Sequence, residues 1–148
     1  MNDRSIPRVA LLLGLAGVIP FIASAALSLS ADMSDAGLQA LAAYAAVILS
    51  FLGGVRWGVL LTEPGRFDTF GAAIISVLPS ILAWLALLLT TVPMLVLLLA
   101  GLVLQYLIDS PVSPLKTGSD FPQWYPRLRL LLSTGAIVCV SVGLYGAM

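Results

Sequence analysis

Residues Leu38 to Leu61 read LQALAAYAAVILSFLGGVRWGVLL, an apolar run with a single charged side chain, Arg56. A helix needs about 20 apolar residues to cross the hydrocarbon core of a bilayer, and this run is long enough to do so. A membrane-spanning β-strand would show alternating polar and apolar residues, and the run does not alternate. It therefore predicts a transmembrane helix.

Four further apolar segments, residues 9–29, 70–89, 93–108 and 126–145, lie before and after this run. Most of them have the length of a membrane-crossing helix, although the segment 93–108 is short for one. The composition agrees, because 60% hydrophobic and 9% charged residues leave too few charges for the surface of a soluble protein of 148 residues. We predict one all-α membrane domain over residues 1–148, a bundle of five transmembrane helices.

The positions of the basic residues predict how these helices are oriented. All of them fall before the first segment, near the end of the second, in the connections 62–69 and 109–125, or in the first residues of the last segment: Arg4, Arg8, Arg56, Arg66, Lys116, Arg127 and Arg129. The connections 28–37 and 90–92 carry no Lys or Arg. Because cytoplasmic loops are enriched in Lys and Arg, we expect the N-terminus in the cytoplasm and the C-terminus outside.

Residues 109–125 differ from the apolar segments and predict an interfacial loop on the cytoplasmic side. Repeated prolines forbid a regular helix there, and the polar stretch 116–120 reads as a solvated turn. Phe121, Trp124 and Tyr125 follow as an aromatic belt of the kind that marks the membrane–water interface.

Small residues recur at intervals of four in two of the predicted helices. Ser50, Gly54 and Gly58 belong to such a stripe in the segment 38–61, and Gly135, Cys139 and Gly143 to another in the segment 126–145. Small side chains let helix backbones approach closely, so the stripes predict either packing within the bundle or a homodimer face. We expect packing, and therefore expect Gly54→Leu to destabilise the protein more than Leu49→Ala.

Arg56 lies on the opposite face of its helix from Gly54, within about two turns of the cytoplasmic end. A charge at this depth is costly unless it is paired or reaches the interface. In the segment 93–108 and just beyond it, Gln105 and Asp109 form a polar stripe at spacing four, and Asp109 lies at the same depth as Arg56. We predict an ion pair between Arg56 and Asp109, with Gln105 as a further hydrogen-bond partner.

The polar and aromatic residues expected at the depth of the cytoplasmic leaflet allow two interpretations. The candidate set consists of Arg56, Trp57, Gln105, Asp109, Trp124, Tyr125 and Arg129. It is either a structural ion pair with interfacial anchors or a pocket for an anionic group such as a lipid headgroup, a carboxylate or a quinone head.

The residue inventory argues against several activities. The chain has no His and one Cys, which removes the commonest general base and any internal disulfide, and it predicts no metal site and no cofactor. The zero net charge gives no electrostatic footprint for nucleic acid. Cys139 lies in an apolar run and reads as a packing residue. We expect the protein not to be an enzyme.

Two stretches resemble a known family. The run YAAVILSFLGGVRWG at residues 44–58 and the run FPQWYPRLR at residues 121–129 are similar to the signatures of the domain-of-unknown-function 3429 family, also called transmembrane protein 69-like. The resemblance covers most of the chain. It implies a small multi-span protein of bacterial membranes and of mitochondrion-bearing organisms, and it implies no activity.

Two classes of function remain open. The first is a non-enzymatic accessory or assembly component of a complex in the bacterial cytoplasmic (inner) membrane, with the lipid bilayer and a membrane-protein partner or a second copy as its contacts. The second is a small oligomeric transporter, or a protein that binds a lipid or quinone, using the pocket of Arg, Asp and Trp residues at the cytoplasmic leaflet. Proline-interrupted helices fit a transporter, but internal repeats, the usual sign of one, are not evident.

Overall fold

The computed structural model describes residues 5–62, 70–110 and 122–148. It contains five α-helices: α1 (Arg8–Ser28), α2 (Ser34–Thr62), α3 (Phe70–Ala86), α4 (Thr91–Asp109) and α5 (Tyr125–Gly146). The described ranges hold no β-strand, and the predicted all-α class is confirmed.

Four of the five helices, α1, α2, α4 and α5, are long and apolar enough to cross a membrane, whereas α3 is a shorter apolar helix. The prediction of a short fourth segment was wrong. Helix α4 has 19 residues because it extends to Asp109, while α3 has 17 because the chain turns after Ala86. Backbone hydrogen bonds from Leu88 to Leu85 and from Leu89 to Ala86 form that turn.

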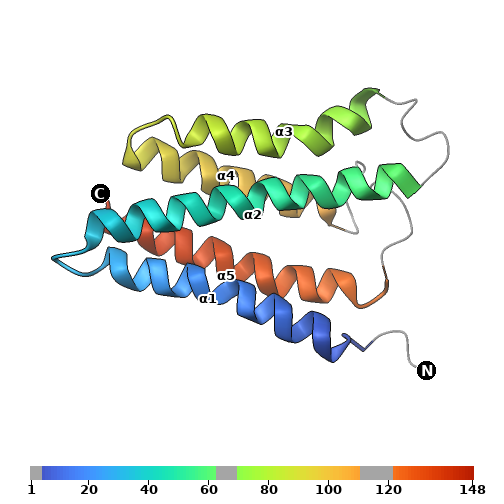
Figure 1. The fold of residues 1–148 in the computed structure, drawn as a ribbon, viewed down its shortest axis with the longest axis horizontal. Coiled ribbons are helices and arrows are strands. Elements are labelled where there is room, and N and C mark those ends of the chain that lie inside the picture. Colours follow the sequence, from blue (N-terminus) through green and yellow to red (C-terminus); the bar gives the residue numbers. More distant parts are fainter. Residues whose placement is uncertain (1–4, 63–69, 111–121) are drawn as a thin grey trace.

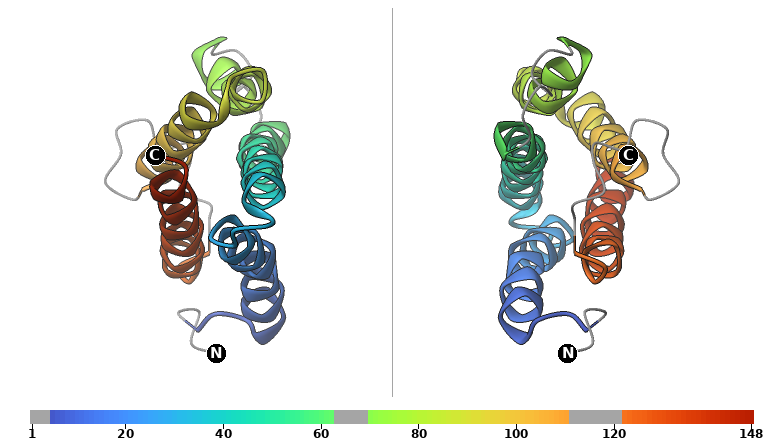
Figure 2. Two further views of the ribbon diagram at one scale, coloured as in Figure 1. Left: turned by 90° about the vertical axis from the view of Figure 1, so that its left-hand side faces the viewer. Right: turned by 90° about the vertical axis from the view of Figure 1, so that its right-hand side faces the viewer.

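The helices form a closed ring in chain order, in which each packs against the next and α5 packs against α1 (Figure 2). Helix α2 is central, since it also contacts α4 and α5 across the ring. Successive helices run in opposite directions, so the two chain ends lie at opposite ends of the bundle (Figure 1). Helices α2 and α4 end where α5 begins, and this shared end holds the candidate site.

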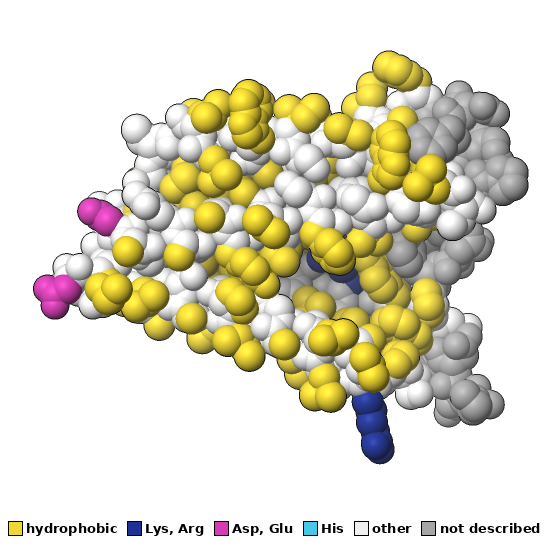
Figure 3. Space-filling model, in the orientation of Figure 1, with side chains coloured by type: hydrophobic (Ala, Val, Ile, Leu, Met, Phe, Trp, Pro, Cys, Tyr) yellow, Lys and Arg dark blue, Asp and Glu magenta, His cyan; other side chains and the backbone are white. Residues whose placement is uncertain are grey.

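The surface of the bundle is divided by type of side chain. Large apolar side chains such as Leu12, Phe51 and Trp84 are exposed along its length, and Figure 3 shows them spread over one flank. Asp32 and Asp35 lie exposed at the end with the α1–α2 turn. Arg8 and Arg127 are exposed on the first turns of α1 and α5, at the other end. A membrane protein needs an apolar belt between charged ends.

Parts of the sequence-based interpretation fall on residues outside the described ranges. These are the basic residues Arg4, Arg66 and Lys116 and most of the predicted interfacial loop, residues 111–121.

The predicted stripe of small residues is only partly a packing surface. Gly135 and Gly143 of α5 face neighbouring helices, Gly135 against Val18 and Gly143 against Leu41. Gly54 and Gly58 of α2 are exposed, and no atom lies within 4 Å of the position that a Cβ would take on either of them. Ser50 is half-buried. The expectation that Gly54 and Gly58 pack within the bundle was therefore wrong.

The close approach on α2 is made by Gly53 instead, one residue earlier. A Cβ on Gly53 would lie 2.5 Å from the backbone oxygen of Ser76 in α3, and 3.5 Å from the ring of Pro79. The inward face of α2, with Leu41, Ala45 and Leu49, forms the core, and Leu49 packs against Gly101 of α4. In lipid both faces of such a helix are apolar, so hydrophobicity does not show which one turns inward.

Candidate functional site

A cluster of polar side chains lies buried where α2, α4 and α5 meet. It consists of Arg56 from α2, Gln105 and Asp109 from α4, and Arg129 and Ser133 from α5. Arg56 is 5% exposed, Gln105 2% and Arg129 8%. We call these five residues the ionic cluster.

Arg56 contacts the end of α4 in two ways. Its Nε donates to Oδ1 of Asp109 at 2.7 Å, and its Nη2 donates to the backbone oxygen of Ile108 at 3.2 Å. The last carbonyl groups of a helix lack partners within the helix, so the second bond satisfies one of them. One guanidinium thus neutralises a carboxylate and caps a helix end.

Arg129 approaches the same carboxylate from α5. Its Nη2 donates to Oδ2 of Asp109 at 3.1 Å, and its Nη1 donates to Oγ of Ser133 at 2.8 Å. The amide of Gln105 donates to Oδ2 of Asp109 at 3.3 Å. Asp109 therefore accepts hydrogen bonds from three side chains on three helices.

Helical spacing explains why these side chains converge. Gln105 and Asp109 are four residues apart on α4, as are Arg129 and Ser133 on α5, and side chains at that spacing share a helix face. The buried residues Ala136, Val140 and Gly143 continue the face of Ser133 along α5. The register that packs α5 into the ring thus also brings Arg129 to Asp109.

Counted over the described residues, the cluster holds an excess of positive charge. Within the described part of the chain, two guanidinium groups meet one carboxylate. Nε of Arg129 is buried and has no hydrogen-bond partner among the described residues. An unpaired buried donor costs about 1–3 kcal/mol, and more when it is charged.

The predicted aromatic residues lie at the same end of the bundle. The rings of Trp124 and Tyr125 pack edge to face, with centroids 6.3 Å apart, and both residues are half-buried. Trp57 is partly exposed on α2, beside Arg56 in the sequence. These positions fit interfacial anchors.

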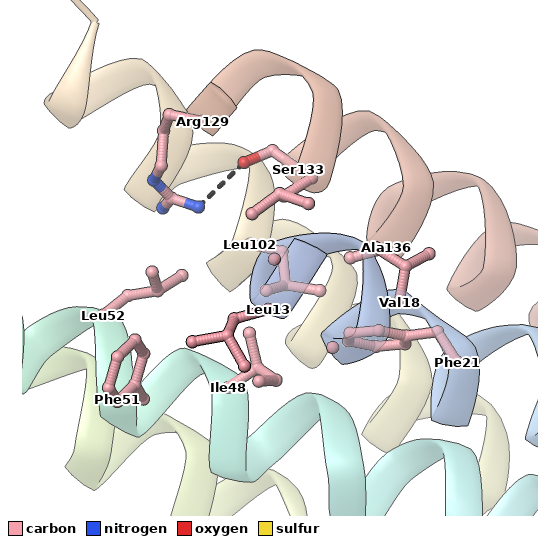
Figure 4. Close-up of a pocket in the computed structure, with 13 residues that line it drawn as sticks. Leu13, Val18, Phe21, Ile48, Phe51, Leu52, Leu102, Arg129, Ser133 and Ala136 are labelled. Carbon is pink, nitrogen blue, oxygen red and sulfur yellow. Dashed lines mark hydrogen bonds between the residues drawn. The ribbon is translucent and has the colours of Figure 1, made fainter. Parts of the chain in front are cut away.

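A cavity of about 220 Å³ adjoins the cluster. Its walls come from four helices and consist of apolar residues, glycine and two polar residues, Arg129 and Ser133: Leu13, Gly14, Gly17, Val18, Phe21, Ile48, Phe51, Leu52, Leu102, Arg129, Leu132, Ser133 and Ala136. Figure 4 shows the guanidinium of Arg129 at one end of this space, on the side of Leu52 and Phe51.

The structure brings Arg56, Gln105, Asp109 and Arg129 together, and it adds Ser133 and the cavity, which sequence reasoning missed. The spacing of Arg129 and Ser133 on one face of the last predicted helix was the available signal for Ser133. The cavity had no such signal, because Gly14, Gly17 and Phe21 of α1 read as ordinary apolar sequence. In the described ranges, no three His, Cys, Asp or Glu side chains gather as a metal site would require.

Apolar helices with exposed apolar flanks and a buried ionic cluster at one end define a polytopic helical membrane protein. The chain belongs to the family described as "Protein of unknown function (DUF3429)", which matches residues 6–145 and confirms the resemblance seen in the sequence.

Two relatives carry the name "Transmembrane protein 69". The protein of Xenopus tropicalis is 38% identical over 141 residues, which cover 90% of this chain and 53% of the relative. The protein of Mus musculus is 32% identical over 146 residues, which cover 93% of this chain and 56% of the relative. The chain thus spans about half the length of these curated relatives. No solved structure matches it.

Proposed function

We propose that this protein is a non-enzymatic accessory or assembly component of a larger complex in the bacterial cytoplasmic membrane. It crosses the membrane five times, with its N-terminus in the cytoplasm. Its partner is a transmembrane helix of another membrane protein, which docks on the outward face of α2.

The outward face of α2 carries this proposal. Gly54 and Gly58 lie one turn apart there, with open space where their side chains would be, and Phe51 beside them is exposed. Lipid chains are as apolar as leucine, so helices associate in a bilayer through close backbone approach at small residues. Two glycines with open space beside them on an exposed helix face suit the close approach of an incoming helix.

The ionic cluster supports a structural rather than a catalytic role. Asp109 is its only carboxylate among the described residues, and hydrogen bonds from Arg56, Gln105 and Arg129 occupy its oxygens. With its oxygens occupied in this way, Asp109 joins three helices to one another.

The lengths of the helices support five membrane-spanning helices, and the positions of the charged residues support an N-terminus in the cytoplasm. Helix α3 is about 25 Å long at a rise of 1.5 Å per residue, somewhat less than a hydrocarbon core of about 30 Å. The exposed apolar residues Leu87–Leu89 extend it at the end opposite the ionic cluster. The exposed Arg8 and Arg127 lie at the end assigned to the cytoplasm, and Asp32 and Asp35 at the other.

Site-specific photo-crosslinking in cells tests the partner helix. A photoreactive phenylalanine analogue replaces Phe51, which is 64% exposed beside Gly54 and Gly58, or as a matched control Trp84 of α3, which is 61% exposed. We expect an adduct with a different membrane protein at position 51 and none at position 84. In the Gly54→Leu/Gly58→Leu background the adduct should vanish. An adduct of two copies of this chain, or equal adducts at both positions, would contradict the proposal.

A further inference from the structure

The cavity beside Arg129 has the form of a binding site for an amphiphile, and no role in the ion pairs requires it. Helices α1 and α2 pack closely near their connecting turn and separate toward the other end, with α5 behind them (Figure 1). The close half is fixed by Tyr44, whose hydroxyl donates to the backbone oxygen of Gly17 at 2.8 Å and whose ring packs against Phe21. Gly17 and Phe21 also line the cavity, so it begins where this contact ends.

The cavity is accessible from the flank of the bundle, where the lipid would be. Figure 3 shows a hollow in the apolar flank with a basic side chain at its back. The lining residues from α1 and α2 include Leu13 and Phe51, both of which are exposed. A chain from the surrounding lipid can therefore enter sideways, without passing through water.

The size and lining fit one hydrocarbon chain. A volume of about 220 Å³ is below the roughly 300–1,000 Å³ typical of pockets for drug-sized ligands. Such a space admits part of one acyl chain but not a whole phospholipid. The walls away from Arg129 and Ser133 offer apolar contacts only.

The end of the cavity at Arg129 fits an anionic oxygen. The guanidinium of Arg129 and the hydroxyl of Ser133 line that end. Nη1 and Nη2 of Arg129 donate to Ser133 and Asp109, and each carries a second hydrogen beyond these bonds. Among the described residues, the nearby charges are two guanidinium groups against one carboxylate. A buried excess charge is costly in a membrane, and an anion against the guanidinium of Arg129 would offset it.

We propose that this cavity binds an anionic amphiphile, with one acyl chain between α1, α2 and α5 and its charged oxygen at the guanidinium of Arg129. The shared chemistry of the ligand is a phosphate or carboxylate at the head of a hydrocarbon chain. An anionic phospholipid and a free fatty acid both supply it. Phe51 lies at the edge of both this binding site and the outward face of α2, whose Gly54 and Gly58 do not line the cavity.

A fluorescence titration of the full chain in an uncharged detergent tests the proposal. The probe is cis-parinaric acid, a fatty acid whose fluorescence rises in an apolar site. Its methyl ester has the same chain without the charge. We expect the ester to bind at least about tenfold more weakly, as loss of a charged hydrogen bond implies. Phosphatidylglycerol and oleate serve as competitors, and whichever displaces the probe at the lower concentration identifies the source of the head group.

Two variants separate the chain from the head group. Gly17→Leu fills the cavity, because the position of its Cβ is open apart from the Tyr44 hydroxyl at 3.8 Å. It should abolish binding of acid and ester alike. Arg129→Gln should lower the affinity for the acid to that for the ester. If this variant does not fold, Arg129→Lys replaces it: lysine keeps the positive charge, so this variant should retain part of the preference for the acid. Gly71→Leu is the matched control, since the position of a Cβ on Gly71 of α3 is open and Gly71 does not line the cavity, and it should bind the acid like the unaltered protein.

Several results would overturn the proposal. Equal binding of acid and ester would show that no charge is recognised. Unchanged binding in Gly17→Leu would place the chain elsewhere. Displacement by inorganic phosphate as effective as that by phosphatidylglycerol would reveal a free-anion site, and displacement by a neutral quinone alone would exclude an anionic ligand.

Discussion

Arg129 of α5 donates to the carboxylate of Asp109 in α4 at 3.1 Å, on the oxygen that Arg56 does not use. The ion pair between α2 and α4 is thus one half of a bridge in which a single acidic residue joins three helices. Asp109 is the residue on which the arrangement depends, and the predictions for the cluster follow from that.

Asp109→Ala should destabilise the protein more than Arg56→Ala. The first change leaves two buried guanidinium groups without an anion, which typically costs about 3–5 kcal/mol, whereas the second leaves Asp109 still paired with Arg129. Thermal unfolding in detergent measures the order. Arg127→Ala, on an exposed position, is the control and should change little. A larger loss in Arg56→Ala would contradict the shared carboxylate.

Exchanging the charges of the first pair should not restore stability. For two isolated residues, Arg56→Asp with Asp109→Arg would recover part of the loss. In this structure the new arginine at position 109 would face Arg129, and like charges at that distance repel. Melting temperatures of the single and double variants decide this, and recovery to near the unaltered value would show that Arg129 does not contribute.

The adjacent glycines of α2 provide a matched comparison. Gly53→Ala places a Cβ 2.5 Å from the backbone oxygen of Ser76, where neither helix can yield without moving, whereas Gly54→Ala meets open space. Overpacking of this kind costs about 1–3 kcal/mol. Unfolding temperatures should fall for the first variant and hold or rise slightly for the second, because alanine favours a helix more than glycine does. A similar fall in unfolding temperature for both variants would contradict the orientation of α2 in which Gly53 faces α3 and Gly54 faces outward.

Leu49→Ala should destabilise the protein more than Gly54→Leu, which reverses the order expected from sequence. Leu49 is 1% exposed in the core, so its truncation leaves a cavity and lowers the free energy of unfolding by about 2–5 kcal/mol. The leucine at position 54 would project outward from the bundle. The check is the unfolding temperature of each variant in the same detergent, and a greater loss for Gly54→Leu would restore the original assignment of faces.

Labelling of single cysteines tests the orientation in the membrane. In a Cys139→Ser background, a cysteine replacing Asp35 should react with an impermeant maleimide on intact cells, and one replacing Arg127 should react only after permeabilisation. Both positions are exposed, so access to water rather than burial determines the outcome. The reverse pattern would place the N-terminus outside.

The helices and the first ion pair were predictable, because both depend on position along the chain. Apolar length marks each helix, and counting residues from the ends of two helices places Arg56 and Asp109 at one depth. The hydrophobic faces were not predictable in the same way. A soluble helix turns its apolar face inward, but a helix in lipid is apolar all round, so Gly53 and Gly54 were equally plausible as the buried glycine.

The second ion pair required information that the sequence does not carry locally. Arg129 follows the connection 110–124, and neither its depth nor the rotation of α5 can be counted from Asp109. Its partner was fixed by how α5 packs in the ring, with Ala136, Val140 and Gly143 facing inward. The cavity is likewise a property of how α1 diverges from α2.

Closure of the ring by α5 has a consequence for biosynthesis. A chain emerges from the ribosome in order, so α2 and α4 leave it before α5 does. Until then, Asp109 is neutralised by Arg56 alone, and both the second arginine and one wall of the cavity are missing. The newly made protein therefore passes through a four-helix stage whose ionic centre is incomplete, and the arrival of Arg129 marks the point at which the nascent bundle becomes the mature one.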